Sequence, residues 1–142
     1  MTLTREETTT LLARTRLFAG VDPEGLQRIA GRVTELDVPA ERVIARQGEI
    51  GTGFFIIVSG AVRVVRDGET IAELGPGAFF GELSVLDQRP RIAQVVSSES
   101  TICLALASWD FEAVVQEQPS VAMAILRELA GRLRELTEAQ HH

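Results

Sequence analysis

The chain has 142 residues, of which 45% are hydrophobic and 24% are charged, so we expect one packed domain and no disordered tail. The 20 acidic and 14 basic side chains give a net charge of −6, which argues against a nucleic-acid-binding surface, because neutralising phosphates needs a basic stripe. A single cysteine excludes a disulfide framework, and no apolar run is long enough to span a membrane, so a cytoplasmic protein is expected.

Two helices are predicted near the start of the chain, within residues 1–35. Thr4 and Glu7 form a capping-box pattern, in which each side chain satisfies the backbone N–H of the other residue. Asp22 followed by Pro23 predicts a second helix, because aspartate caps free N–H groups and proline is favoured in the first turn.

Between residues 36 and 107 the pattern changes to short runs of β-forming residues separated by glycine. These runs cover residues 43–44, 54–58, 62–65, 70–74, 94–96 and 101–106. Asp67-Gly68 lies between two of the runs and is a strong signal for a β-hairpin. Many short strands at this spacing indicate an antiparallel jelly-roll β-barrel.

Helical patterns return at the end of the chain, over residues 108–140. Ser108 is predicted to cap one helix, and a longer helix follows Pro119. The longer helix carries leucines at steps of three and four, which form a packing seam: Leu126, Leu129, Leu133 and Leu136. The seam packs either on the barrel of its own chain or on a second copy. The expected fold class is α+β, mainly β: a single domain over 1–142, with N-terminal helices, a jelly-roll barrel and a C-terminal helix pair.

The segment over residues 80–93 does not fit the alternation of strands and turns. Gly81 frees the backbone after a strand, and the residues after it can form a helical turn whose free N–H groups hold an anion. Arg91 suits the bidentate binding of a phosphate, and Glu82 can accept hydrogen bonds from sugar hydroxyls. Together these groups indicate a sugar phosphate. The competing interpretation is an ion pair between Glu82 and Arg91 that serves the structure alone.

Two motifs in this segment resemble a known binding site. They are Phe80-Gly81-Glu82-Leu83-Ser84-Val85-Leu86 and Pro90-Arg91-Ile92-Ala93. Both are similar to the phosphate-binding cassette of cyclic nucleotide-binding domains, of the type found in the catabolite activator protein and in kinase regulatory subunits. The segment from Arg46 to Gly60 resembles the glycine-rich early strands of that family. The order of helices, barrel and helices also matches, so the resemblance extends over nearly the whole chain.

The resemblance implies a regulatory, non-enzymatic module that binds a cyclic nucleotide as ligand and needs no cofactor or metal. Arg91 would pair with the cyclic phosphate, and Glu82 would accept a hydrogen bond from the ribose 2′-hydroxyl. The other implied phosphate and ribose contacts are Gly81, Leu83, Ser84, Ile92 and Ala93. The implied base-packing or lid residues are Val62, Ile71, Arg132 and Thr137. Many members have Ser, Thr or Ala in place of Ile92, and the lack of a hydroxyl there favours cyclic AMP over cyclic GMP.

The resemblance also implies that the last helix is either a dimer helix or a lid over the nucleotide, and we expect a homodimer formed through it. No direct contact with nucleic acid or membrane is expected. The alternative is a ligand-free interaction domain that keeps the fold and uses the helix to dimerise. A cupin-type enzyme is excluded because its metal site needs histidines within the barrel, and His141 and His142 are the only histidines in the chain.

Overall fold

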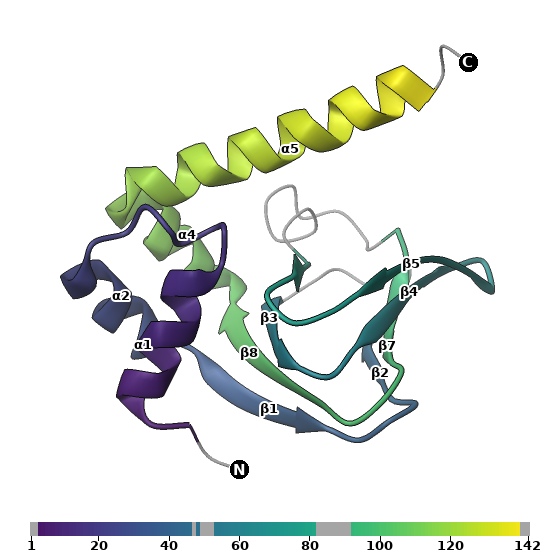
Figure 1. The fold of residues 1–142 in the computed structure, drawn as a ribbon, viewed down its shortest axis with the longest axis horizontal. Coiled ribbons are helices and arrows are strands. Elements are labelled where there is room, and N and C mark those ends of the chain that lie inside the picture. Colours follow the sequence, from purple (N-terminus) through teal and green to yellow (C-terminus); the bar gives the residue numbers. More distant parts are fainter. Residues whose placement is uncertain (1–2, 47, 49–52, 82–91, 140–142) are drawn as a thin grey trace.

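The computed structural model describes residues 3–46, 48, 53–81 and 92–139. It places the shorter helices beside one end of a β-barrel and the long C-terminal helix across the barrel (Figure 1). The helices are α1 (Arg5–Arg14), α2 (Pro23–Ala30), α4 (Ser108–Glu117) and α5 (Pro119–Ala139). The first four strands are β1 (Thr34–Val38), β2 (Val43–Ala45), β3 (Gly53–Ser59) and β4 (Val62–Arg66). The others are β5 (Glu69–Leu74), β6 (Phe79–Phe80), β7 (Gln94–Ser97) and β8 (Thr101–Ala107).

The strands form two four-stranded sheets with the orders β1-β8-β3-β6 and β2-β7-β4-β5. All of the strand pairs between described residues are antiparallel. The predicted fold class, an antiparallel β-barrel flanked by helices, is therefore confirmed. The sequence pattern did not single out β1 or β6 as separate strands. At Asp67-Gly68 the predicted hairpin is present, and both residues have the positive φ that a type I′ turn requires, 52° and 81°.

The N-terminal caps form as predicted. The Thr4 hydroxyl accepts a hydrogen bond from the Glu7 N–H at 3.1 Å, and the Thr4 N–H donates to Glu7 Oε1 at 3.0 Å. The Asp22 carboxylate accepts from the Gly25 N–H at 2.7 Å. The predicted cap at Ser108 is wrong: β8 runs directly into α4, so Ala107 is the cap residue and Ser108 lies inside the first turn.

The core consists of two apolar clusters that lie on opposite faces of the β1-β8-β3-β6 sheet. The cluster that includes the helices contains Phe54, Ile56, Leu104, Leu106 and Phe111. The cluster inside the barrel contains Ala45, Ile57, Val62, Phe80, Val95 and Cys103. Successive residues of β3 and β8 alternate between the two clusters, since side chains on a strand point to opposite faces. This explains why residues 54–58 form a continuous apolar run: the strand is covered on both sides.

Aromatic rings connect β3 to β6 in both clusters. On the helical side, the Phe54 ring lies 5.5 Å from that of Phe79 and 4.8 Å from that of Phe111 on α4, measured between centroids. Inside the barrel, Phe55 and Phe80 stack at 5.0 Å. Two consecutive residues of β6, Phe79 and Phe80, therefore contribute one ring to each cluster.

Cys103 is a core residue of the barrel cluster. Its side chain is fully buried inside the barrel, and this burial raises the pKa of the thiol to about 11. The thiol therefore stays protonated at neutral pH and behaves as a small apolar group.

Candidate functional site

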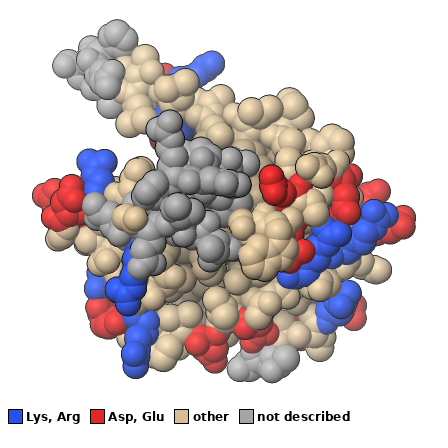
Figure 2. Space-filling model, turned by 180° about the vertical axis from the view of Figure 1, so that it is seen from behind, with Lys and Arg blue, Asp and Glu red and all other residues tan. Residues whose placement is uncertain are grey.

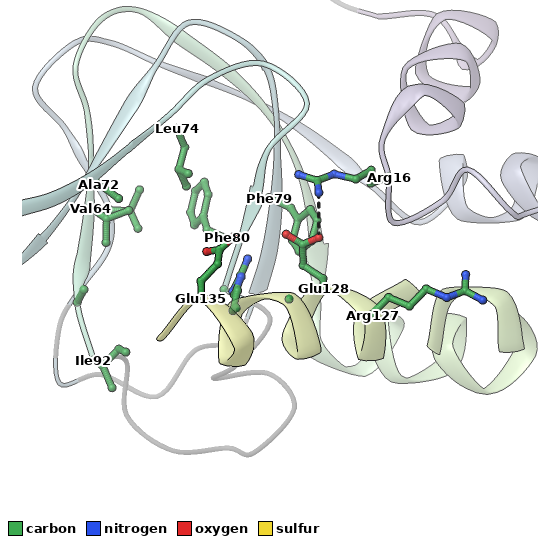
Figure 3. A pocket seen from close by; sticks show the side chains of 15 residues that line it. Arg16, Val64, Ala72, Leu74, Phe79, Phe80, Ile92, Arg127, Glu128 and Glu135 are labelled. Atoms are coloured by element: carbon green, nitrogen blue, oxygen red, sulfur yellow. Dashed lines mark ion pairs between the residues drawn. The ribbon is translucent and has the colours of Figure 1, made fainter. Parts of the chain in front are cut away.

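A cavity of about 650 Å³ opens between the barrel and α5 (Figure 3). Its apolar wall comes from β4, β5, β6 and β7, through Val64, Ala72, Leu74, Phe79, Phe80 and Val95. A second wall comes from residues on either side of the 82–91 segment, which are Gly81, Ile92 and Ala93. The charged wall comes from the loop after α1 and from α5, through Arg16, Arg127, Glu128, Gly131, Arg132 and Glu135. An apolar floor with a few charged groups is typical of small-ligand sites.

The apolar wall includes β4 and β5, the strands that carry the predicted base-packing residues, but different residues of these strands line the cavity. Val64 pairs with Ala72 across β4 and β5, and both side chains line the cavity. Ile71 points to the opposite face of β5 and is 48% exposed, because neighbouring residues on a strand alternate. Val62 is fully buried within the barrel cluster. The structure therefore does not bring Val62 or Ile71 to the cavity.

Described residues from both ends of the cassette line the cavity. Gly81 follows β6 with a φ of 94°, a conformation that side chains with a Cβ rarely adopt. Ile92 and Ala93 lie before β7, and Ile92 is 66% exposed. Gly81, Ile92 and Ala93 line one cavity although ten residues separate the first two in sequence. The other candidate cassette residues, Glu82, Leu83, Ser84 and Arg91, lie outside the described residues.

Helix α5 forms the charged wall with side chains three or four residues apart, which lie on one face of a helix. The Arg132 guanidinium lies 5.8 Å from the centroid of the Phe79 ring, within the range of a cation–π contact. Glu128 forms an ion pair with Arg16 at 3.4 Å, which joins α5 to the loop after α1 (Figure 3). Of the two predicted lid residues, Arg132 lines the cavity and Thr137 does not. The Thr137 hydroxyl donates to the Leu133 carbonyl of its own helix at 2.9 Å.

The charges on this wall are more positive than those of the chain as a whole. The described lining carries three arginines and two glutamates, a net charge of 3 − 2 = +1, whereas the chain carries −6. Among the described residues no cluster of His, Cys, Asp or Glu could hold a metal ion. An anionic organic ligand fits this combination of an apolar floor and a locally positive wall.

Several lining residues were not singled out from the sequence. Phe79 and Phe80 belong to the two core clusters, yet both also line the cavity, with relative exposures of 8% and 6%. On α5, Glu128 and Glu135 lie four residues before and three residues after Arg132. Helical spacing from Arg132 would have found both.

The charged face seen from behind the molecule is mixed in sign. Figure 2 shows Arg and Asp/Glu side chains interspersed around the edge of this face, with no continuous basic stripe among the described residues. Elsewhere among the described residues, Arg63 and Glu41 form an ion pair, which raises the pKa of Arg63 and lowers that of Glu41. No described helix is both long and apolar enough to cross a membrane.

Comparisons with known proteins agree on one family. A family model described as cyclic nucleotide-binding domain matches residues 35–118. The cyclic AMP receptor protein of Thermus thermophilus is 37% identical over 124 residues, which are 84% of this chain and 57% of that protein. A cyclic nucleotide-gated potassium channel of Mesorhizobium japonicum is 38% identical over 112 residues, which are 79% of this chain and 31% of the channel.

The structural comparison extends the likeness to the whole fold. The crystal structure of Thermus thermophilus catabolite activator protein matches with a TM-score of 0.83 at 36% identity, and the match covers 89% of this chain and 62% of that chain. The chain therefore spans less than two thirds of the length of each of these three proteins.

Proposed function

Because the chain belongs to the cyclic nucleotide-binding domain family, we propose that it is a regulatory module that binds cyclic AMP and transmits this binding through α5. One observation carries the proposal. Gly81, Ile92 and Ala93, which belong to the two ends of the cassette, line the same cavity as Arg132 of α5. A nucleotide held at the cassette would therefore touch the helix directly. Two of its relatives are a receptor and a gated channel, which supports a regulatory and non-enzymatic role. We further propose that the module works in the cytoplasm.

The roles of the individual residues follow from the cassette motif. We propose that Arg91 pairs with the cyclic phosphate and that Glu82 accepts from the ribose 2′-hydroxyl. Backbone N–H groups near Leu83 and Ser84 would complete the phosphate site, with close approach allowed at Gly81. The base would lie against the apolar wall, where Val64 and Ala72 take the place that the sequence suggested for Val62 and Ile71.

Calorimetric titration tests the choice of ligand. Cyclic AMP is expected to bind several-fold more tightly than cyclic GMP, because Ile92 offers no hydroxyl to the guanine amino group or to the phosphate. In the matched variant Ile92→Thr, the added hydroxyl is expected to raise cyclic GMP affinity by about two- to tenfold. Equal or tighter binding of cyclic GMP by the parent would contradict the choice. The absence of a binding signal with both nucleotides at millimolar concentration would favour a ligand-free interaction domain.

We also propose that α5 joins two copies of the chain. Three of its leucines are exposed, Leu126, Leu133 and Leu136, and Leu133 is 66% exposed. Leu129, the other member of the predicted seam, is half-buried against the helical core cluster. The exposed leucines therefore form an apolar stripe that a second α5 would cover in a two-fold dimer.

Analytical ultracentrifugation tests the dimer. Replacing Leu126 and Leu133 together with Glu is expected to give a monomer that still folds, because neither side chain contributes to the buried core. Arg134→Glu is the control on the same helix, and it is expected to leave the dimer intact, since Arg134 is exposed and polar. If the parent chain already sediments as a monomer at tens of micromolar, α5 does not form the dimer.

A further inference from the structure

A second groove lies next to the ligand cavity. It has a volume of about 460 Å³ and is formed by the end of α1 and the turn between β5 and β6. Arg16 and Leu74 line both spaces, so the groove continues from the first cavity. In Figure 3, Arg16 and Leu74 lie on the side of the cavity away from Ile92, so the groove begins opposite the cassette end.

The groove carries two arginines with little internal compensation. Arg14 forms no ion pair with any other residue in the described part of the chain. Arg16 has the 3.4 Å contact with Glu128, and its side chain remains 85% exposed. The one carboxylate of the groove among the described residues is Glu73, which stands directly opposite Arg63 in the β4–β5 register, while Arg63 forms its ion pair with Glu41. Two arginines and one glutamate still leave this lining with a net positive charge. The two guanidinium groups are therefore available to an anion.

Backbone N–H groups of the turn between β5 and β6 are mostly missing or already used. Pro76 has no N–H, and the Gly77 N–H already donates to the Ile57 carbonyl at 2.8 Å. A Cβ added at Gly75 would meet nothing within 4 Å, so there is room above the turn. An anion in this space would be held by the two arginine side chains, whose planar forks bind phosphate oxygens in pairs.

We propose that this groove is a phosphate-binding subsite formed by Arg14 and Arg16. The phosphate is either a free inorganic ion or a second phosphate group of a nucleotide that lies in the first cavity. In both cases it competes with Glu128 for Arg16, and it thereby weakens the ion pair that joins Glu128 of α5 to Arg16 in the loop after α1. Binding of an anion at the subsite would thus change how α5 is held to the loop after α1. The nucleotide source rests on the proposed function, whereas the inorganic source does not.

Inorganic pyrophosphate, titrated calorimetrically at constant ionic strength, is the first probe. Arg14→Gln is expected to weaken its binding roughly tenfold, because one of two charged forks is lost. Gly75→Asp is expected to abolish it, since the added carboxylate would stand in the groove, while Gly75→Ser should change it little. Arg134→Gln on the exposed face of α5 is the control for general charge, and it should bind as the parent does. Thermal melts confirm that each variant folds.

Cyclic di-AMP, which carries two phosphate groups, and cyclic AMP, which carries one, distinguish the two sources. If the ligand supplies the phosphate, Arg14→Gln weakens cyclic di-AMP and leaves cyclic AMP unchanged. If a free ion supplies it, the same variant weakens pyrophosphate alone. Unchanged binding of both pyrophosphate and cyclic di-AMP by Arg14→Gln overturns the subsite, as does an equal loss in Arg134→Gln. Failure of the parent to bind cyclic AMP overturns the proposed function and leaves the pyrophosphate result standing.

Discussion

Replacing Arg91 with Ala is expected to lower the affinity for cyclic AMP by about 30-fold to a few thousand-fold, or roughly 2–5 kcal/mol. Arg91 is the proposed partner of the ligand's single negative charge. Without it, a desolvated phosphate would face only backbone N–H groups. Arg91→Lys keeps the charge but loses the planar fork, so it should weaken binding by a smaller factor. The measurement is a calorimetric titration of each variant with cyclic AMP.

Arg89→Ala is the matched control for this prediction, because Arg89 lies two residues away and no cassette role is assigned to it. It should bind cyclic AMP almost as the parent does. All three variants should melt near the parent temperature, since Arg91 is proposed to serve the ligand and not the core. Undiminished binding by Arg91→Ala would contradict the cassette assignment of residues 80–93.

Replacing Gly60 with Ala is expected to destabilise the fold by about 2–5 kcal/mol, because backbone strain and a steric clash add up. Gly60 joins β3 to β4 with a φ of 90°. A Cβ there would lie 2.8 Å from the Thr101 Cα and even closer to the Ser100 carbonyl oxygen. Backbone atoms cannot move aside as a flexible side chain can. Urea unfolding followed by circular dichroism measures the loss.

Gly68→Ala separates strain from the clash. Gly68 also has a positive φ, 81°, but an added Cβ would meet nothing within 4 Å. The free energy of unfolding of this variant should therefore fall only by the cost of the left-handed conformation, about 1–2 kcal/mol. Equal losses at the two positions would show that the contact between the Gly60 turn and Thr101 does not restrict the chain.

The close contact between the Gly60 turn and β8 is fixed by the hydroxyl of Thr101. The Thr101 hydroxyl lies within hydrogen-bonding distance of the Glu99 carbonyl at 2.8 Å and of the Ala61 carbonyl at 3.2 Å. Thr101 is fully buried, so these contacts hold the start of β8 against the turn between β3 and β4. The same contacts make the region intolerant of any added volume.

Local signals predicted much of the fold. The capping box at Thr4, the cap at Asp22 and the hairpin at Asp67-Gly68 each depend on residues within four positions of one another, so they can be recognised from sequence alone. The short strand β6 gave no such signal. Its two residues are too few to show an alternation, and its pairing with β3 is a long-range contact.

The site was harder to predict because depth within the barrel is a non-local property. Ile71 is apolar but lies on the outer face of β5, whereas its neighbour Ala72 lies on the opposite face and lines the cavity. Val62 and Val64 share one face of β4, yet Val62 lies in the core and only Val64 reaches the cavity. The leucine seam of α5 was predicted from its period, but the period does not say that Leu129 turns toward the core cluster.

The position of β6 has a mechanical consequence. Phe79 contacts the ligand cavity and, through Phe54, reaches Phe111 of α4, while the next residue, Phe80, contacts the same cavity and stacks inside the barrel. A ligand that displaces β6 would therefore shift the packing of the helices through Phe79 and the packing of the barrel interior through Phe80. The helices and the barrel cannot respond separately, so they should unfold in a single cooperative step, and a bound ligand should slow amide hydrogen exchange on both sides of the sheet together.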